Sequence, residues 1–247
     1  MTALAAEGLT RRFGGLTAVD EVSLALTAGE LHAVIGPNGA GKSTLVNLLA
    51  GELRPSAGRI LLGGEDVTDW PAWRRARRGI GRSFQRTNLL REMTVFENAR
   101  LAAQAGGFGL RRWLVGAARD LPSLAEAERV LARVGLADRA GAVAGTLSHG
   151  ELRLLEIAMA LANRPAVLLL DEPLAGMGPE ESERVGALLR DLARDHALLL
   201  IEHDMDVVFA VADLLTVMVD GRVLERGTPA SIRASAAVRD AYLGHSA

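Results

Sequence analysis

The 247-residue sequence contains no cysteine, and Lys42 is its only lysine. The lack of cysteine excludes disulfides, thiol catalysis and cysteine-based zinc sites. No apolar run approaches the roughly 20 residues that a membrane-spanning helix needs. The N-terminus also lacks a basic segment followed by an apolar one, which is the pattern of a secretion signal. These absences predict a soluble, cytoplasmic protein.

Neither sign of charge dominates the chain. Its 28 Lys and Arg residues nearly balance 30 Asp and Glu residues, which argues against a large basic surface for nucleic acid. Hydrophobic residues make up 49% of the sequence, enough to bury the core of one large α/β domain. The strong preference for arginine is typical of a GC-rich genome. The one remaining lysine therefore suggests a position where a compact ammonium group is needed and a broader guanidinium is not accepted.

Lys42 lies in a glycine-rich stretch that matches the pattern G-x-x-x-x-G-K-[ST]. Residues 31–35 before it predict a short buried strand, and residues 43–50 after it predict a helix that stops at Gly51. In this context the loop N–H groups and the helix N-terminus bind phosphate, Lys42 reaches the β- and γ-phosphates, and Ser43 holds Mg²⁺. We predict a nucleoside-triphosphate site made by Gly36, Pro37, Asn38, Gly39, Ala40, Gly41, Lys42, Ser43 and Thr44.

A second apolar run ends in two carboxylates. Residues 167–170 predict a buried parallel strand, whose C-terminal end lies where ligands bind in α/β sheets. Asp171 is then placed to hold Mg²⁺, and Glu172 to polarise the attacking water. The alternative is that the two acids only end the strand before the turn at Pro173. The phosphate loop favours the ATPase interpretation.

The segment Leu147-Ser148-His149-Gly150-Glu151, followed by a helical run and then by Asp171, resembles the hallmark of the ATPase subunits of ABC transporters. That hallmark reads L-S-G-G-Q; Ser148 and Gly150 match it, whereas His149 and Glu151 differ. Taken alone, the segment is more often a helix N-terminus than a functional segment. Ser148 would then be the N-cap and Glu151 would complete a capping box.

Three further positions resemble elements of the same family. Gln85 resembles the glutamine loop, which contacts Mg²⁺ or the attacking water and reports to a transmembrane partner. His203 follows an apolar strand at 198–201 and resembles the histidine that contacts the γ-phosphate. Phe13 resembles the aromatic residue on which adenine stacks, with a core phenylalanine as the alternative. The resemblance thus implies Glu172, His203 and Gln85 as catalytic residues, and Ser43, Gln85 and Asp171 as Mg²⁺ ligands.

The resemblance runs from about residue 4 to about residue 244 and implies an ABC-type P-loop ATPase domain of the α/β class. Residues 1–86 and 165–247 would form a mixed sheet core with an antiparallel β element. Residues 87–164 would form an inserted helical lobe that carries Ser148.

Local patterns agree with this division. Gly63-Gly64 and Asp220-Gly221 each lie between apolar strands and predict hairpin turns. Residues 124–134 have helical spacing. The arginine-rich residues 74–78 predict the solvated basic face of a short helix.

In the family, two ATPase subunits bind ATP between the phosphate loop of one and the Ser148-type segment of the other. Ser148 and Gly150 are therefore expected to act in trans, in a homodimer or a heterodimer. Gly178 stands where the family usually has an Asp that contacts the partner. The effects of His149 and Gly178 are left open by the sequence.

Four details resemble the ATPases of branched-chain (hydrophobic) amino-acid uptake systems and their urea and amide relatives. They are the string 201–205, the turn 175–177, the terminal 241–244 and an extra stretch from about 104 to 121. The resemblance implies a second ATPase subunit, membrane permeases and an extracytoplasmic binding protein. The chain would then lie on the cytoplasmic face of the inner (plasma) membrane, attached through the permeases.

Several alternatives remain at this level. They are a urea or amide importer ATPase, a lipopolysaccharide-export ATPase and a soluble ABC-type ATPase. The last class usually carries tandem cassettes, zinc modules or basic linkers, none of which occurs here. A GTPase is disfavoured because the guanine-reading string N-K-x-D is absent. No residue in the chain identifies the transported solute.

Overall fold

The computed structural model of the protein describes residues 2–83, 89–105 and 120–243, the last two residues by their backbone only. Gln85 lies outside the described residues, as do most of the stretch predicted at about 104 to 121 and the final glycine of the string 241–244.

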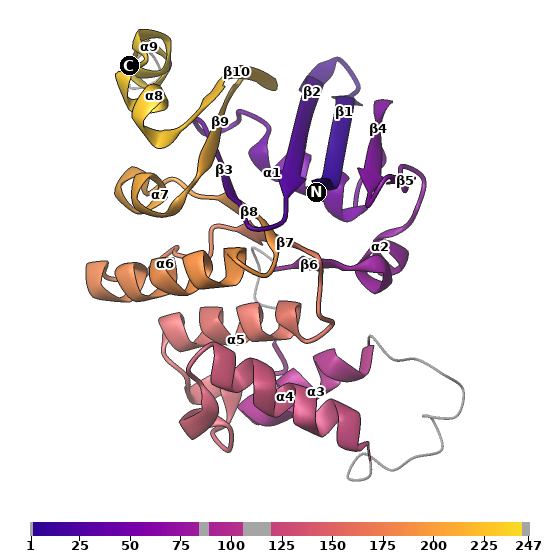
Figure 1. Ribbon diagram of the computed structural model, residues 1–247, viewed down its shortest axis with the longest axis vertical. Helices are drawn as coiled ribbons and strands as arrows, with labels where there is room; N and C mark the ends of the chain where they lie inside the picture. Colours follow the sequence, from indigo (N-terminus) through magenta and orange to yellow (C-terminus); the bar gives the residue numbers. More distant parts are fainter. Residues whose placement is uncertain (1, 84–88, 106–119, 244–247) are drawn as a thin grey trace.

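A four-stranded antiparallel sheet has the strand order β2–β1–β4–β5 (Figure 1). In β2, Val22, Leu24 and Leu26 are buried, whereas Ser23 and Ala25 between them are exposed. This alternation places one face of the sheet on the core and leaves the other to solvent. The strands are β1 (Thr2–Phe13), β2 (Leu16–Thr27), β4 (Ala57–Leu62) and β5 (Glu65–Asp66).

A mixed six-stranded sheet has the order β10–β9–β3–β8–β7–β6. Five of its strands pair in parallel, and β10 is antiparallel to β9. The parallel strands end at the same edge, where ligands bind in α/β sheets. The strands are β3 (Leu31–Ile35), β6 (Ile80–Arg82), β7 (Val167–Asp171), β8 (Ala197–Ile201), β9 (Leu214–Val219) and β10 (Arg222–Gly227).

Helices surround the mixed sheet, and α3, α4 and α5 pack on one another at one end of the molecule (Figure 1). These three helices lie within residues 87–164, although the proposed boundaries themselves stay a prediction. None of the described helices has the length and apolar character that a bilayer crossing needs. The α-helices are α1 (Lys42–Ala50), α2 (Ala72–Arg78), α3 (Val95–Ala105), α4 (Leu121–Arg133), α5 (His149–Leu161), α6 (Pro179–Ala193), α7 (Met205–Val211), α8 (Pro229–Ala234) and α9 (Ala236–Leu243).

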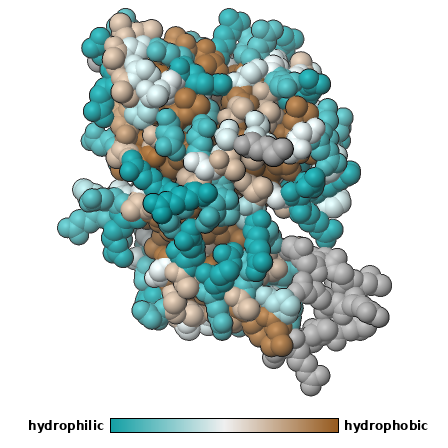
Figure 2. Space-filling view, in the orientation of Figure 1, coloured by the Kyte–Doolittle hydropathy of each residue, from teal (hydrophilic) through white to brown (hydrophobic). Residues whose placement is uncertain are grey.

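The mixed sheet separates two hydrophobic clusters. Leu168 and Leu170 of β7 face the cluster that includes α4, α5 and α6, whereas Val167 and Leu169 face the cluster that includes α1 and the antiparallel sheet. Because both faces of β7 are covered, its apolar residues run without interruption. On the face seen in Figure 2, hydrophilic residues line most of the outline and hydrophobic residues show mainly between them. The predicted α/β class, with a mixed sheet and an antiparallel β element, is confirmed.

Both predicted hairpin turns are present. Gly63 and Gly64 join β4 to β5 with φ values of 57° and 85°, and Asp220 and Gly221 join β9 to β10 with φ values of 49° and 79°. Positive φ at both central positions is the signature of a type I′ turn, which matches the twist of paired strands. The predicted strand at 31–35 is also confirmed as β3. The predicted helices at 43–50 and 124–134 are confirmed as α1 and α4.

The prediction of a fully solvated basic face on α2 is wrong for Arg75, which is only 1% exposed. Its Nη1 donates to the carbonyl oxygens of Leu48 (2.7 Å) and Leu49 (2.9 Å) at the end of α1. Its Nε donates to Trp70 O and its Nη2 to Thr68 O. Burial lowers the pKa of the guanidinium to about 10. The helix C-terminus offers carbonyls without partners, and a positive charge there is favourable, so this arginine faces inward.

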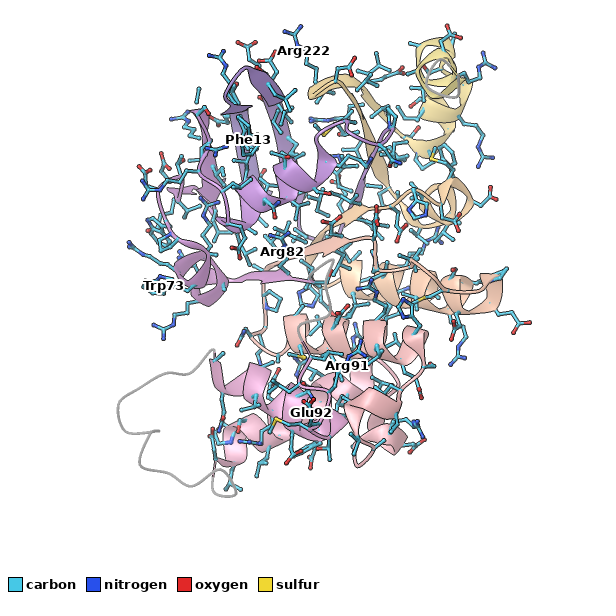
Figure 3. All side chains as sticks on the ribbon, turned by 180° about the vertical axis from the view of Figure 1, so that it is seen from behind. Phe13, Trp73, Arg82, Arg91, Glu92 and Arg222 are labelled. Carbon is cyan, nitrogen blue, oxygen red and sulfur yellow. The ribbon has the colours of Figure 1, made fainter. Side chains whose placement is uncertain are left out.

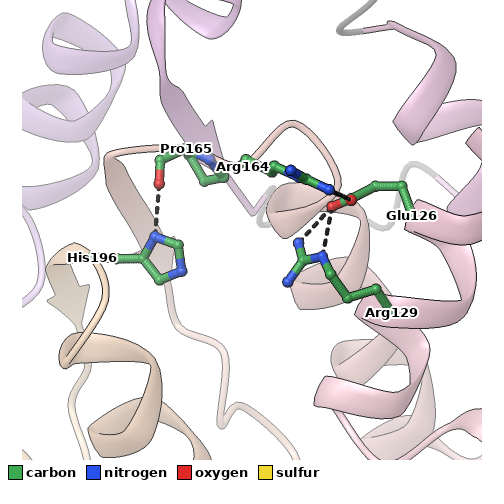
Figure 4. Close-up of polar contacts among 5 residues, drawn as sticks. All are labelled: Glu126, Arg129, Arg164, Pro165 and His196. Carbon is green, nitrogen blue, oxygen red and sulfur yellow. Dashed lines mark hydrogen bonds and ion pairs between the residues drawn. The ribbon is translucent and has the colours of Figure 1, made fainter. Parts of the chain in front are cut away.

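A second polar cluster, centred on the buried Glu126, joins α4 to the loop that precedes β7 (Figure 4). Glu126 Oε2 accepts hydrogen bonds from Arg164 Nε (3.0 Å) and Nη2 (2.8 Å), and Oε1 accepts one from Arg129 Nε. Burial alone would raise the pKa of Glu126, but these arginines outweigh it and lower the pKa. The carbonyl oxygen of Pro165 in this loop accepts a hydrogen bond from Nδ1 of His196, the residue before β8, at 2.7 Å.

Candidate functional site

The predicted phosphate loop follows β3 directly and leads into α1, which begins at Lys42. Gly36 has φ 152°, and a Cβ at this position would lie 2.0 Å from the carbonyl oxygen of Met218. Gly41 has φ 95°, and a Cβ there would lie 2.2 Å from the carbonyl oxygen of Ala18. Both positions therefore require glycine, because the loop passes so close to neighbouring backbone.

The ammonium group of Lys42 lies inside this loop. Its Nζ donates to the carbonyl oxygens of Gly36 (2.7 Å) and Pro37 (3.0 Å). Burial lowers the pKa of Lys42, and the nearby carboxylates of Glu172 and Asp171 partly oppose this shift. The lysine of the first motif and the acids of the second are thus close enough to interact electrostatically, although β8 lies between β3 and β7 in the sheet.

Asp171 ends strand β7 and is only 2% exposed. Its backbone N–H donates to Ser83 Oγ, but its Oδ1 has no hydrogen-bond partner in the part of the chain that the structure describes. Burial raises the pKa of this carboxyl, while Arg82 and Lys42 oppose the shift. Arg82 lies where the sheet meets the helices (Figure 3). A buried acceptor without a partner calls for an explanation, and a bound cation supplies one.

The donors around Asp171 fit Mg²⁺. This ion prefers hard oxygen ligands, binds through one or two carboxylates and completes its shell with phosphate oxygens and water. Asp171 Oδ1 offers one such carboxylate oxygen, and the Ser43 hydroxyl at the start of α1 is a second hard donor. Within residues 2–83, 89–105 and 120–243, no three His, Cys, Asp or Glu side chains form a metal cluster. One carboxylate and one hydroxyl suit an ion whose remaining ligands are phosphate oxygens and water.

Glu172 and His203, both predicted as catalytic, lie together. His203 Nδ1 is 3.9 Å from Glu172 Oε1, although the two residues follow different strands. Glu172 has φ 51°, which is uncommon for a residue with a side chain, and its N–H donates to Ile201 O at 2.9 Å. Such backbone strain is concentrated at functional sites, where surrounding contacts maintain it.

Sequence reasoning missed Glu202, which is 1% exposed. Its Oε1 accepts a hydrogen bond from the Leu174 N–H (2.7 Å), and its Oε2 accepts one from the His203 N–H (3.1 Å). Burial raises the pKa of this carboxyl, and the two hydrogen bonds partly oppose the shift. The available signal was an acidic residue that directly continues a fully apolar strand, since a buried acid needs a specific partner.

Ser148 is the N-cap of α5, and the capping box weighed as an alternative is present. Ser148 Oγ accepts from the Glu151 N–H, and Glu151 Oε2 accepts from the Ser148 N–H at 2.8 Å. Arg139 also pairs with Glu151 at 2.9 Å. A Cβ on Gly150 would lie 2.7 Å from Glu181 Oε1, the end of an exposed and flexible side chain that would have to move aside. Within the described ranges, no hydrogen bond joins Ser148 to the phosphate loop of its own chain.

Phe13 and Gly178 are the two remaining predicted positions that the structure describes. Phe13 ends β1, is 43% exposed, and lies with its ring centroid 4.5 Å from the Arg11 guanidinium (Figure 3). Phe13 is therefore available to a ligand and is not a core residue. Gly178 is the N-cap of α6 and has no side chain to bond across an interface.

Comparison with known proteins places this geometry in context. Residues 19–175 match the family described as ABC transporter, and residues 222–247 match the family described as Branched-chain amino acid ATP-binding cassette transporter. The high-affinity branched-chain amino acid transport ATP-binding protein LivG of Salmonella typhimurium is 41% identical over 98% of this chain and 97% of its own. BraF of Pseudomonas aeruginosa, with the same description, is 41% identical over the same shares.

Solved structures agree with the sequence matches. An ATP-binding cassette of an ABC transporter in its ADP conformation superposes with a TM-score of 0.89 at 30% identity, over 99% of each chain. A nucleotide-free ATP-binding cassette gives a TM-score of 0.88 at 30% identity, over 98% of this chain and 99% of the other.

Proposed function

The chain belongs to the ABC transporter family of ATP-binding proteins, and from this premise we propose that it is the ATP-hydrolysing subunit of an importer for branched-chain, hydrophobic amino acids. The observation that carries the proposal is the full-length similarity to LivG and BraF, together with the branched-chain family match at residues 222–247. The phosphate loop alone would not support an importer for these amino acids, because P-loop ATPases with many different tasks share it.

At the site, the phosphate loop would bind the triphosphate of ATP, and Phe13 would stack on the adenine. Ser43, Asp171 and Gln85 would hold Mg²⁺, which supplies positive charge to the β- and γ-phosphates. Asp171 Oδ1, which has no hydrogen-bond partner among the described residues, supports this assignment.

For hydrolysis, the Glu172 carboxylate would accept a proton from the attacking water. The new bond forms between the water oxygen and the γ-phosphorus, and the bond to the β-phosphate oxygen breaks to release ADP. His203 would orient the γ-phosphate, and its proximity to Glu172 supports a shared task.

A second ATPase subunit would complete the site. Each chain offers one phosphate loop and one Ser148 segment, and the two are carried by α1 and α5 in different parts of the fold. Two chains in head-to-tail contact would therefore make two complete sites, with Ser148 and Gly150 contributed in trans.

The permease contact would lie at an apolar groove between α2 and the helices α3 and α5. Its cavity volume is about 360 Å³, and it is lined by residues that include Trp73, Ala76, Ile80 and Met159. Trp73 is 62% exposed and projects from α2 at the edge of the molecule (Figure 3). Ser83 also borders the groove and lies just before the predicted glutamine loop. A permease segment bound in the groove would therefore lie close to the ATP site.

Two experiments test the function. Purified protein should hydrolyse ATP much faster than GTP, and Lys42→Ala should abolish ATP turnover. Turnover retained in this variant would remove the site assignment.

In the second experiment, the complex that co-purifies with the tagged chain is reconstituted in vesicles with its binding protein. Uptake of leucine, isoleucine or valine is expected, whereas uptake of urea or amides alone would select the alternative importer class. A complex that has no binding protein would favour export.

A further inference from the structure

The turn that carries Glu172 is anchored at both ends by two consecutive residues, the last residue of β8 and the residue after it. On one side, the strained Glu172 donates its N–H to Ile201 O. On the other, Leu174 donates its N–H to the carboxylate of Glu202 at 2.7 Å. Pro173, between them, has no N–H to give. The Glu202 side chain is therefore the anchor on the C-terminal side of Glu172.

The same carboxylate also holds the segment of His203. Glu202 Oε2 accepts the His203 N–H at 3.1 Å, and it lies 3.7 Å from His203 Nδ1. One buried carboxylate thus accepts backbone hydrogen bonds from the Glu172 turn and from the His203 segment. The side chains of Glu172 and His203 themselves lie 3.9 Å apart.

Only a carboxylate satisfies both contacts. It can accept at each of its two oxygens, whereas a glutamine has one acceptor oxygen and an NH₂ group that only donates. At a site with 1% exposure, water does not replace a lost acceptor. A glutamine at this position would therefore set an NH₂ against a backbone N–H and push one of the two segments away.

We infer that Glu202 is a positioning residue for ATP hydrolysis, whose carboxylate keeps the Glu172 turn and His203 in a fixed relation. The inference rests on the proposed function, since it takes Glu172 and His203 to act on ATP. Displacement of a reacting group by about 1 Å is enough to cost on the order of 100-fold in rate.

The test compares Glu202→Gln with the wild-type full-length chain. We expect kcat to fall at least tenfold while the Kd for ATP changes less than twofold, because in the described part of the chain the Glu202 carboxylate bonds to Leu174 and His203 and not to the phosphate loop. Amide hydrogen exchange of peptides covering residues 171–178 should accelerate. Glu202→Asp keeps both acceptor oxygens on a shorter arm and should retain more activity than the glutamine variant.

Glu126→Gln provides the matched control. Glu126 is another buried glutamate, 7% exposed, but it bonds to Arg129 and Arg164 away from the predicted site. This variant should lose stability without a change in kcat or in exchange at residues 171–178.

The outcomes distinguish the positioning role of Glu202 from the proposed function. Wild-type kcat in Glu202→Gln, or a loss of ATP binding in parallel with kcat, would overturn the positioning role. If Glu202→Gln does not fold, wild-type turnover in Glu202→Asp together with unchanged exchange at 171–178 would overturn it, and a reduced kcat with faster exchange would support it. Absence of ATP hydrolysis by the wild-type chain would instead refute the proposed function, and the inference with it.

Discussion

His203 Nδ1 lies 3.9 Å from Glu172 Oε1, where the ends of β8 and β7 meet. Neither residue is near the other in the sequence, and their contact depends on the pairing of these neighbouring parallel strands. The proximity links the two side chains that we expect to act on the attacking water and on the γ-phosphate.

Glu172→Gln should still bind ATP but lose hydrolysis by roughly 100-fold to 10,000-fold, the range for loss of a general base. Because ATP then persists, the variant should accumulate as a dimer. Light scattering after size exclusion, with and without Mg²⁺-ATP, measures this. A variant that stays monomeric with ATP bound would contradict the model of ATP held between two subunits.

Ser148→Arg, placed in the Glu172→Gln background, should prevent the ATP-dependent dimer while ATP binding by the single subunit remains. The bulky side chain would block the surface that meets the partner's nucleotide. Ser231→Arg, an exposed serine on α8, serves as the control. Dimer formation by the Ser148 variant would argue against the role in trans.

Lys42→Arg should lower turnover on the order of 100-fold, the cost of losing one well-placed charge-stabilising group. The guanidinium keeps the charge but is broader than the space between Gly36 and Pro37, whose carbonyls hold the ammonium. Steady-state ATPase assays measure the effect. Near wild-type turnover would show that the single lysine of this chain reflects composition only.

Chemical labelling gives an independent check on Lys42. Burial lowers its pKa, so at a given pH more of the amine is neutral and reactive than in an exposed lysine. An acylating reagent should modify this side chain besides the N-terminal amine, and ATP should protect it. Peptide mass spectrometry quantifies both sites. Equal labelling of Lys42 with and without ATP would place the nucleotide elsewhere.

His32 should make the stability of the fold pH-dependent. It is completely buried on β3 with Nε2 2.8 Å from Thr216 Oγ1, and burial lowers its pKa to about 4 from the ordinary 6.5. Its contribution is complete above about pH 6.5. As the pH falls toward 4, the unfolded chain takes up a proton that the folded chain rejects, which costs about 2 kcal/mol by about pH 5.

Urea unfolding near neutral pH and at about pH 5 tests this point. The free energy of unfolding of the wild type should fall more steeply with pH than that of His32→Gln, which has no imidazole to protonate. Parallel pH dependence in the two proteins would contradict the assignment.

Replacement of Arg75 should destabilise the protein strongly. Arg75→Ala removes the side-chain donor of the buried Leu48 and Leu49 carbonyls, of which Leu48 O keeps only the Gly51 N–H at 3.2 Å, and we expect a loss of about 3 kcal/mol. In a chain of this size that lowers Tm by about 6–12 °C. The neighbouring Arg74→Ala is the control, because Arg74 is exposed and lies over the Trp70 ring. Similar Tm values for the two variants would show that the burial of Arg75 contributes little.

The local features of this protein could be predicted from its sequence. The phosphate loop, the uninterrupted strands β3, β7 and β8 and the two hairpin turns each follow from residues a few positions apart. Their periodicity and backbone chemistry do not depend on distant partners. The capping box at Ser148 was recognisable for the same reason, although its pattern could not separate a helix start from a binding segment.

Contacts between residues that are distant in the sequence could be read only from the tertiary structure. The arginine-rich pattern of α2 did not reveal that Arg75 alone turns inward, because that depends on where α1 ends. The bond from Leu174 to Glu202 depends on the pairing of β7 with β8 and on the turn between Asp171 and Leu174. A buried charge is stable only where partners from other elements converge on it, and no local pattern records that convergence.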